Sequence, residues 1–224
     1  MEEKETLVRP SLLSADFTHL GRDFRELIHN NIQAVHFDVM DGSFVKDISF
    51  GEPVFRACQN AFGKKIGIDV HLMVRNPLKQ AERFYQLGAR EIAIHYEALR
   101  GRFDAVRRFR ARHPDCLLGL AINPATDVSL VLGLGSLFDY YLVMSVVPGK
   151  GGQSFIEGSE KKIRALSDAR SINHLDYKIM VDGGINATTG PLCVRNGADY
   201  LVAGSYYFRA EDRSAALRKI HEGI

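Results

Sequence analysis

The chain has 224 residues, and its 29 basic and 27 acidic side chains give a formal net charge of only +2. So small a charge argues against nucleic acid and membrane surfaces as partners, and no apolar run reaches the ~18–20 residues that span a bilayer. The opening segment Met1–Glu5 is charged and lacks the apolar core of a signal peptide. Three scattered cysteines, Cys58, Cys116 and Cys193, make no disulfide framework, so we predict a cytoplasmic protein.

Strand-like apolar runs and helical patterns alternate along the whole chain, and no linker divides it. The runs that predict strands are Leu7–Leu12, Ala34–Val39, Ile66–Leu72, Glu91–His95, Leu117–Ile122, Tyr140–Ser145, Lys178–Val181 and Tyr200–Ala203. Among the helical patterns between them, Pro77–Leu87 and Phe103–Arg112 are clear, and Gly88 and Gly197 stand where a helix ends in a left-handed residue. Eight such units predict an α/β fold, a single (β/α)8 TIM barrel over residues 1–224. Counting strands does not exclude an open doubly wound sheet.

Two of these strands carry groups that bind metals. Alternate side chains of a strand share a face, which groups His36, Asp38 and Met40 on one strand and Asp69, His71 and Met73 on the next. A third apolar run ends in Asp182. If the strands are neighbours, two His and two Asp converge near the strand ends, where barrel enzymes hold their active sites. A set of mixed nitrogen and oxygen ligands suits one divalent metal ion, which could be Zn²⁺, Fe²⁺, Mn²⁺ or Co²⁺. The ligand types do not distinguish among these four metals.

Glycine-rich turns follow the last three predicted strands. They contain Gly149, Gly151 and Gly152, then Gly183 and Gly184, then Gly204 with Ser205. Glycine lets backbone N–H groups surround an anion, and late loops of barrels often bind phosphate. These turns therefore indicate a phosphate site, although a tight turn needs glycine in any case. Met40, Met73 and Met144 at strand ends fit either packing or a soft wall beside the metal, and His95 and Glu97 receive no role.

Six motifs in chain order resemble the ribulose-phosphate 3-epimerase family. They are Pro10–Phe17 (PSLLSADF), His36–Gly42 (HFDVMDG), His71–Val74 (HLMV), Pro148–Phe155 (PGKGGQSF), Val181–Asn186 (VDGGIN) and Val202–Ser205 (VAGS). The resemblance runs from the first strand to the eighth, so it spans essentially the whole chain.

The resemblance implies a metal-dependent isomerase of a small sugar phosphate, which interconverts D-ribulose 5-phosphate and D-xylulose 5-phosphate at C3. Asp38 and Asp182 would be the catalytic acid and base, acting through a metal-stabilised enediolate. The implied metal ligands are His36, Asp38, His71 and Asp182. The implied substrate-binding residues are Ser11, Met40, His71, Met73, Met144, Gly149, Gly151, Gly152, Asp182, Gly183, Gly184, Gly204 and Ser205. We also expect a homo-oligomer.

The chain departs from the family pattern in two loops. Lys150 replaces the usual aromatic residue between the glycines, and Ser43–Asp47 replaces His-Phe-Val-Pro-Asn. Three other functions therefore stay open. One is a 3-epimerase of another ketose phosphate, such as D-allulose 6-phosphate. Another is a decarboxylase or aldol-type synthase, whose Asp-x-Lys-x-x-Asp pattern has no lysine in Asp38–Asp41 here. The third is a non-catalytic phosphosugar-binding barrel.

Overall fold

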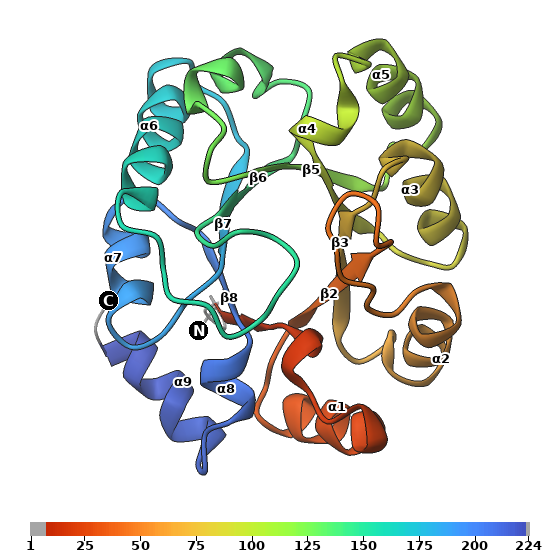
Figure 1. Ribbon diagram of the computed structural model, residues 1–224, viewed down its shortest axis with the longest axis vertical. Helices are drawn as coiled ribbons and strands as arrows, with labels where there is room; N and C mark the ends of the chain where they lie inside the picture. Colours follow the sequence, from red (N-terminus) through yellow and green to blue (C-terminus); the bar gives the residue numbers. More distant parts are fainter. Residues whose placement is uncertain (1–7, 223–224) are drawn as a thin grey trace.

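The computed structural model describes residues 8–222, and eight parallel strands form its centre. The strands are β1 (Val8–Pro10), β2 (Ala34–Met40), β3 (Gly67–Met73), β4 (Glu91–His95), β5 (Leu117–Ile122), β6 (Tyr140–Met144), β7 (Lys178–Asp182) and β8 (Tyr200–Ala203). Each strand pairs with its neighbour in the order β1-β8-β7-β6-β5-β4-β3-β2, and a parallel bridge between Ser11 and His36 joins the two ends. The sheet thus forms the predicted (β/α)8 barrel (Figure 1).

Helices surround the barrel on its outside (Figure 1). They are α1 (Leu20–His29), α2 (Glu52–Phe62), α3 (Pro77–Gln86), α4 (Tyr96–Leu99), α5 (Phe103–Arg112), α6 (Ser159–Ile172), α7 (Thr189–Arg195), α8 (Ser205–Phe208) and α9 (Arg213–Glu222). Short 3₁₀ turns cover Leu12–Ser14, Phe17–His19, Val128–Leu130 and Leu132–Leu134. No helix within residues 8–222 is long and apolar enough to cross a membrane.

The sequence predicted most element boundaries to within a residue. Helix α5 begins and ends where its periodicity does, and Gly88 and Gly197 adopt the expected positive φ, +104° and +106°. The first strand is the main correction, because β1 ends at Pro10 rather than Leu12. Ser11 instead caps a 3₁₀ turn, since its side-chain oxygen accepts a hydrogen bond from the Leu13 N–H. The predicted start of this strand, Leu7, and the charged segment Met1–Glu5 lie outside the described residues.

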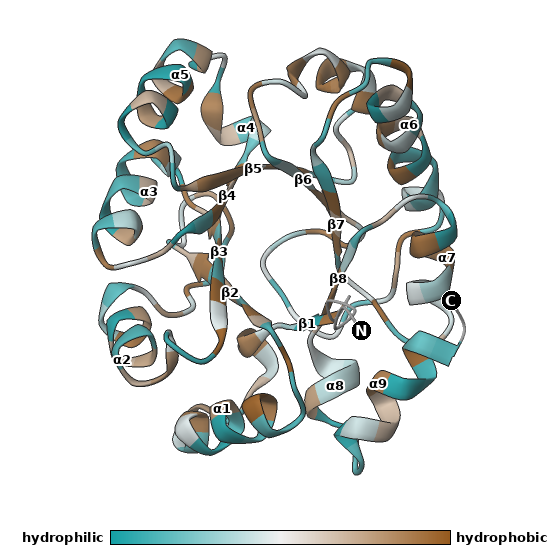
Figure 2. Ribbon diagram, turned by 180° about the vertical axis from the view of Figure 1, so that it is seen from behind, coloured by the Kyte–Doolittle hydropathy of each residue, from teal (hydrophilic) through white to brown (hydrophobic). Residues whose placement is uncertain are grey.

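Two apolar regions hold the fold together, one on each face of the curved sheet. The larger lies between strands and helices, where hydrophobic positions line the strands and the inner helix faces (Figure 2). The smaller fills the barrel interior, with Tyr140, Leu142, Met144 and Met180 among its members. Gly119 leaves room for the Tyr140 ring, since a Cβ there would lie 2.3 Å from it. The barrel centre is thus packed with side chains, as in other TIM barrels, and functional groups lie at its mouth.

Candidate active site and metal centre

Four side chains from three strands converge at the carboxyl end of the barrel. His36 and Asp38 lie on β2, His71 on β3 and Asp182 at the end of β7. One ligand atom from each of the four lies within 4.8 Å of the others. The parallel register places Asp38 directly beside His71, and the His71 Nδ1 atom is 3.0 Å from the Asp38 Oδ1 atom. The Asp182 Oδ2 atom is 3.8 Å from both His36 Nε2 and His71 Nδ1.

Burial makes the charges of this cluster strongly interdependent. Both imidazoles are fully buried, and Asp38 is only 3% exposed. Burial raises the pKa of Asp182 to about 7, and the neighbouring negative charge of Asp38 adds to the rise. Burial alone would also raise the pKa of Asp38, but the charge and hydrogen bond of His36 outweigh it and hold this pKa well below its usual range. The two carboxyl groups therefore differ in proton affinity, as paired acids and bases do.

On the side that faces away from the cluster, the imidazole of His36 is hydrogen-bonded to an acidic side chain. Its Nδ1 atom hydrogen-bonds to Asp69 Oδ1, and Asp69 in turn accepts a 3.0 Å hydrogen bond from Arg9. Burial alone would lower the pKa of His36, but Asp69 and Asp38 raise it well above its usual value. A positive charge is thus favoured between these carboxylates. Burial lowers the pKa of His71 to about 4, which keeps that imidazole neutral at pH 7.

These four donors fit a divalent transition-metal ion. Two imidazole nitrogens, His36 Nε2 and His71 Nδ1, and two carboxylate oxygens point to one place. This is a mixed set typical of Zn²⁺, Fe²⁺, Mn²⁺ or Co²⁺. The imidazole nitrogens that face away from the cluster each have a hydrogen-bond partner, the arrangement that orients metal-binding histidines. The convergence predicted from the sequence is therefore present.

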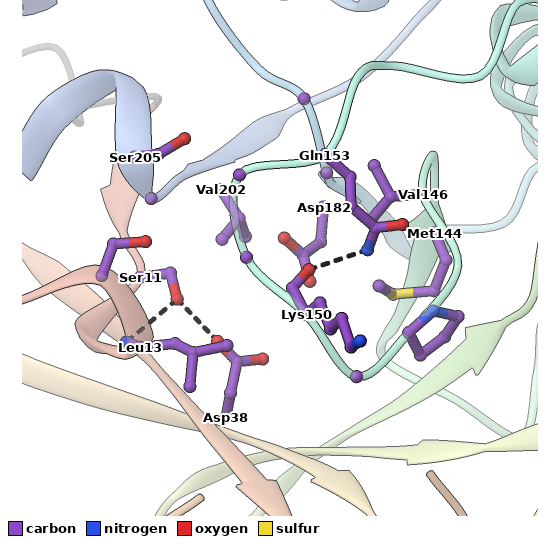
Figure 3. A pocket seen from close by; sticks show the side chains of 18 of the residues that line it. Ser11, Leu13, Asp38, Met144, Val146, Lys150, Gln153, Asp182, Val202 and Ser205 are labelled. Carbon is purple, nitrogen blue, oxygen red and sulfur yellow. Dashed lines mark hydrogen bonds between the residues drawn. The ribbon is translucent and has the colours of Figure 1, made fainter. Parts of the chain in front are cut away.

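A cavity opens above this cluster, and predicted substrate-binding residues line it. Those on its wall are Ser11, Met40, Met73, Met144, Gly149, Gly151, Gly152, Asp182, Gly183, Gly184, Gly204 and Ser205. Asp38, predicted as a catalytic residue and metal ligand, also lines the cavity. His71, also predicted to bind substrate, is fully buried and is not among the lining residues. In Figure 3 Asp38 and Asp182 approach the cavity from different sides, while Ser205 lies farther along its wall. The cavity wall thus combines two acidic side chains with glycine turns and serine hydroxyls.

The hydroxyl of Ser11 has a direct partner in the cluster. It donates a 2.6 Å hydrogen bond to the Asp38 Oδ2 atom (Figure 3). The short β1 explains this contact, because the Ser11–His36 bridge where the barrel closes places Ser11 next to the strand that carries Asp38. The serine thus bonds to the Oδ2 atom of Asp38, while the Oδ1 atom of Asp38 faces the imidazoles.

The glycine turns have backbone conformations and close contacts that side chains would disturb. Gly183 and Gly184 have φ of +121° and +63°, which favours glycine. A Cβ on Gly184 would lie 2.4 Å from the backbone nitrogen of Phe155, and one on Gly204 would lie 2.8 Å from the Ser14 hydroxyl. The turns after β6, β7 and β8 thus all line the same cavity, as expected for a backbone anion site.

The loop between β6 and α6 crosses the mouth of the barrel (Figure 1). Lys150 lies in this loop and lines the cavity, and its backbone carbonyl accepts a 2.8 Å hydrogen bond from the Gln153 amide (Figure 3). The unusual lysine is therefore part of the cavity wall.

Three residues near the cluster received no role from the sequence. Asp69 supports His36, His95 contacts His71 and Glu97 contacts His95. A signal was present for each, because Asp69 shares a strand face with His71, and His95 and Glu97 are two residues apart at a strand end. The alternation of side chains along one strand does not show which side chain of a neighbouring strand each of them contacts.

Known proteins that are similar in sequence to this chain share one description. The model of the ribulose-phosphate 3 epimerase family matches residues 7–208. Ribulose-phosphate 3-epimerase of Treponema pallidum (strain Nichols) is 39% identical over 214 residues, covering 96% of this chain and 96% of the relative. The Serratia marcescens enzyme of the same name is 38% identical over 209 residues, covering 93% of this chain and 98% of the relative.

Solved structures that are more distant in sequence share the fold. KGPDC from Streptococcus mutans superposes with a TM-score of 0.68 at 12% identity, covering 98% of this chain and 97% of that one. At so low an identity the likeness concerns the barrel alone. The family match and the relatives confirm the predicted family and the predicted class of enzyme, an isomerase. The family model matches most of the chain, and the relatives align with it over nearly their whole length. The chain therefore belongs to the ribulose-phosphate 3-epimerase family.

Proposed function

We propose that the protein inverts the configuration at C3 of a ketose phosphate, interconverting D-ribulose 5-phosphate and D-xylulose 5-phosphate. The observation that carries this proposal is the position of Asp38 and Asp182 at one cavity that also contains three glycine turns. The names of the relatives support the substrate. The intact set of acidic and imidazole groups favours catalysis over simple sugar-phosphate binding.

Two carboxyl groups suit this chemistry because inversion needs a proton removed from one face of C3 and returned to the other. In one direction Asp38 takes the C3 proton as a base, while Asp182 supplies a proton to the opposite face. In the reverse direction the two exchange roles. Neither side chain has to move far, since both already face the cavity.

The intermediate of this reaction is an enediolate, which places negative charge on the oxygens of C2 and C3. A divalent cation held by His36, Asp38, His71 and Asp182 would polarise the ketone and stabilise that charge. Ser11 keeps the Asp38 carboxylate oriented by its 2.6 Å hydrogen bond. The thioethers of Met40, Met73 and Met144 line the cavity and limit the access of water to the reacting carbons.

The phosphate is proposed to bind at the glycine turns that line the cavity. Backbone N–H groups of the turns at Gly151–Gly152, Gly183–Gly184 and Gly204–Ser205 can surround its oxygens there. Binding of this distant group fixes the sugar, so that C3 lies between the two carboxyl groups.

The experiment is an assay of the purified chain in heavy water with D-ribulose 5-phosphate and, in parallel, D-allulose 6-phosphate. We expect a 3-epimer product that carries deuterium at C3, with kcat/KM higher for the five-carbon substrate. A higher kcat/KM for the six-carbon substrate would favour the alternative 3-epimerase. Absence of turnover on both would refute the epimerase proposal.

Metal dependence is tested on the same sample. We expect a chelator to abolish turnover and one of Zn²⁺, Fe²⁺, Mn²⁺ or Co²⁺ to restore it. Full activity in a protein shown to be metal-free would refute the metal site.

A cytoplasmic location and a homo-oligomer are also part of this proposal. Cys58, Cys116 and Cys193 are all free and buried, which suits a reducing compartment. Sedimentation equilibrium of the purified chain tests the oligomer, and a monomer at all concentrations would contradict it.

A further inference from the structure

The substrate cavity has one basic side chain on its wall. Among the described residues that line this cavity, Asp38 and Asp182 are acidic and only Lys150 is basic. The glycine turns proposed to bind phosphate offer the partial charges of N–H groups but no full positive charge. A phosphate ester carries about two negative charges at pH 7. Lys150 directly precedes Gly151 and Gly152, so the basic side chain of the cavity adjoins the proposed phosphate position.

The ammonium group of Lys150 has no partner in the part of the chain that the structure describes. The side chain is exposed and makes neither a hydrogen bond nor an ion pair within residues 8–222, and only the backbone carbonyl is bonded, to the Gln153 amide. Lys150 also lines an adjoining cavity of about 450 Å³, whose wall includes residues 42–47 and 147–150. The lysine thus lies where the two cavities meet. A phosphate in the substrate cavity can therefore bind this ammonium group without displacing a protein group.

The turn that carries Lys150 is held by several contacts. The Gln153 amide donates hydrogen bonds of 2.7 Å to the Val147 carbonyl and of 2.8 Å to the Lys150 carbonyl. Gly149 has a φ of +118°, which favours glycine, and a Cβ there would lie 3.2 Å from the Cβ atom of Val45. These contacts hold the backbone of Lys150 at the cavity, while its ammonium group stays unpaired.

We propose that Lys150 is a substrate-binding residue whose ammonium group binds the phosphate of the ketose phosphate. The inference rests on the phosphate site of the proposed function. The phosphate does not change during inversion at C3, so a contact with it stabilises the bound substrate and the transition state equally. Such uniform binding lowers KM and leaves kcat unchanged. A contact with the charge of the enediolate would raise kcat instead, so the two kinetic constants separate these roles.

Lys46 provides a matched control on the neighbouring loop. It is an exposed lysine that lines the adjoining cavity but not the substrate cavity. Its substitution removes the same charge from the same region of the surface and leaves the wall of the substrate cavity unchanged. A difference between the two lysines therefore reports contact with the phosphate, because a general attraction of anions to this region would depend on both.

The test compares the wild type with Lys150→Met, Lys150→Arg and Lys46→Met as full-length proteins. Calorimetric titration with inorganic phosphate gives a Kd, and epimerase assays give kcat and KM for D-ribulose 5-phosphate. We expect Lys150→Met to raise both the Kd and the KM about tenfold, because a charge-assisted hydrogen bond is lost, and to leave kcat within about twofold. Lys150→Arg keeps the charge, so its Kd should stay within about threefold of the wild type. Lys46→Met should change none of the three values. Both lysines are exposed, so we expect every variant to fold.

Several results would overturn the role of Lys150. A phosphate Kd of Lys150→Met within twofold of the wild type overturns it, and so does an equal rise of the Kd in Lys46→Met. A lower kcat with an unchanged KM also overturns it, because Lys150 would then act on the reacting carbons. If the wild type binds no inorganic phosphate, the proposed phosphate site is wrong, and the role of Lys150 with it. If the chain binds phosphate but turns over neither ketose phosphate, the epimerase proposal fails, while a tenfold difference in Kd still supports the contact of Lys150 with phosphate.

Discussion

Removal of the Ser11 hydroxyl should weaken catalysis by a predictable amount. Ser11 donates a 2.6 Å hydrogen bond to the Oδ2 atom of Asp38, and Asp38 is only 3% exposed, so water cannot easily replace the hydroxyl. A hydrogen bond to a buried charged group contributes about 1.5–3 kcal/mol. Since 1.36 kcal/mol corresponds to a tenfold change, Ser11→Ala should lower kcat/KM by about 10- to 100-fold.

The metal content of Ser11→Ala should stay near that of the wild type. The serine bonds to Oδ2, whereas the Oδ1 atom of Asp38 is the one that faces His36 and His71. The assay is therefore kcat/KM for ketose-phosphate epimerisation, measured together with the bound metal per chain.

The variant Ser11→Cys separates the hydrogen bond from the volume of the side chain. It keeps the approximate size of serine but offers only a weak S–H donor, so it should resemble Ser11→Ala. Activity within threefold of the wild type in both variants would refute the argument that this hydroxyl supports the Asp38 carboxylate.

Two other predictions concern the carboxyl groups and the cysteines. Asp38→Asn and Asp182→Asn should each lower turnover by at least two to three orders of magnitude, since each change removes a proton-transfer group and a candidate metal ligand. Near-normal turnover in either variant would contradict the assignment of these residues as the acid and base. Burial raises the pKa of Cys58 to about 11 and those of Cys116 and Cys193 to about 12. At pH 8 these thiols are protonated, so a disulfide reagent should modify them only after denaturant unfolds the chain, and rapid labelling of the native protein would show that they are accessible.

Much of the site could be predicted because it depends on strand geometry that is local in the sequence. Alternation places His36 and Asp38 on one face, and the position of Asp182 at a strand end brings it to the mouth of any parallel barrel. The glycine turns after the last three strands could be predicted from the sequence for the same reason, since each turn directly follows its strand. The closure of the barrel needed the structure, because an open sheet would show the same alternation of side chains.

The contacts between side chains were decided by the tertiary structure. Two residues of β4 and its following turn, His95 and Glu97, were visible at a strand end, but nothing local links them to His71 on β3. The hydrogen bond of Ser11 to Asp38 likewise depends on where β1 ends and the barrel closes.

The sequence by itself therefore determined the strands, their inward faces and the chemistry available at the barrel mouth, because these follow from the two-residue repeat of a strand and from side-chain identity. Only the tertiary structure decided which nitrogen of each histidine faces the cluster and what holds the other one. The physical reason is that hydrogen-bond partners are selected by the register and closure of strands distant in the chain, at distances of about 3 Å that no local pattern encodes.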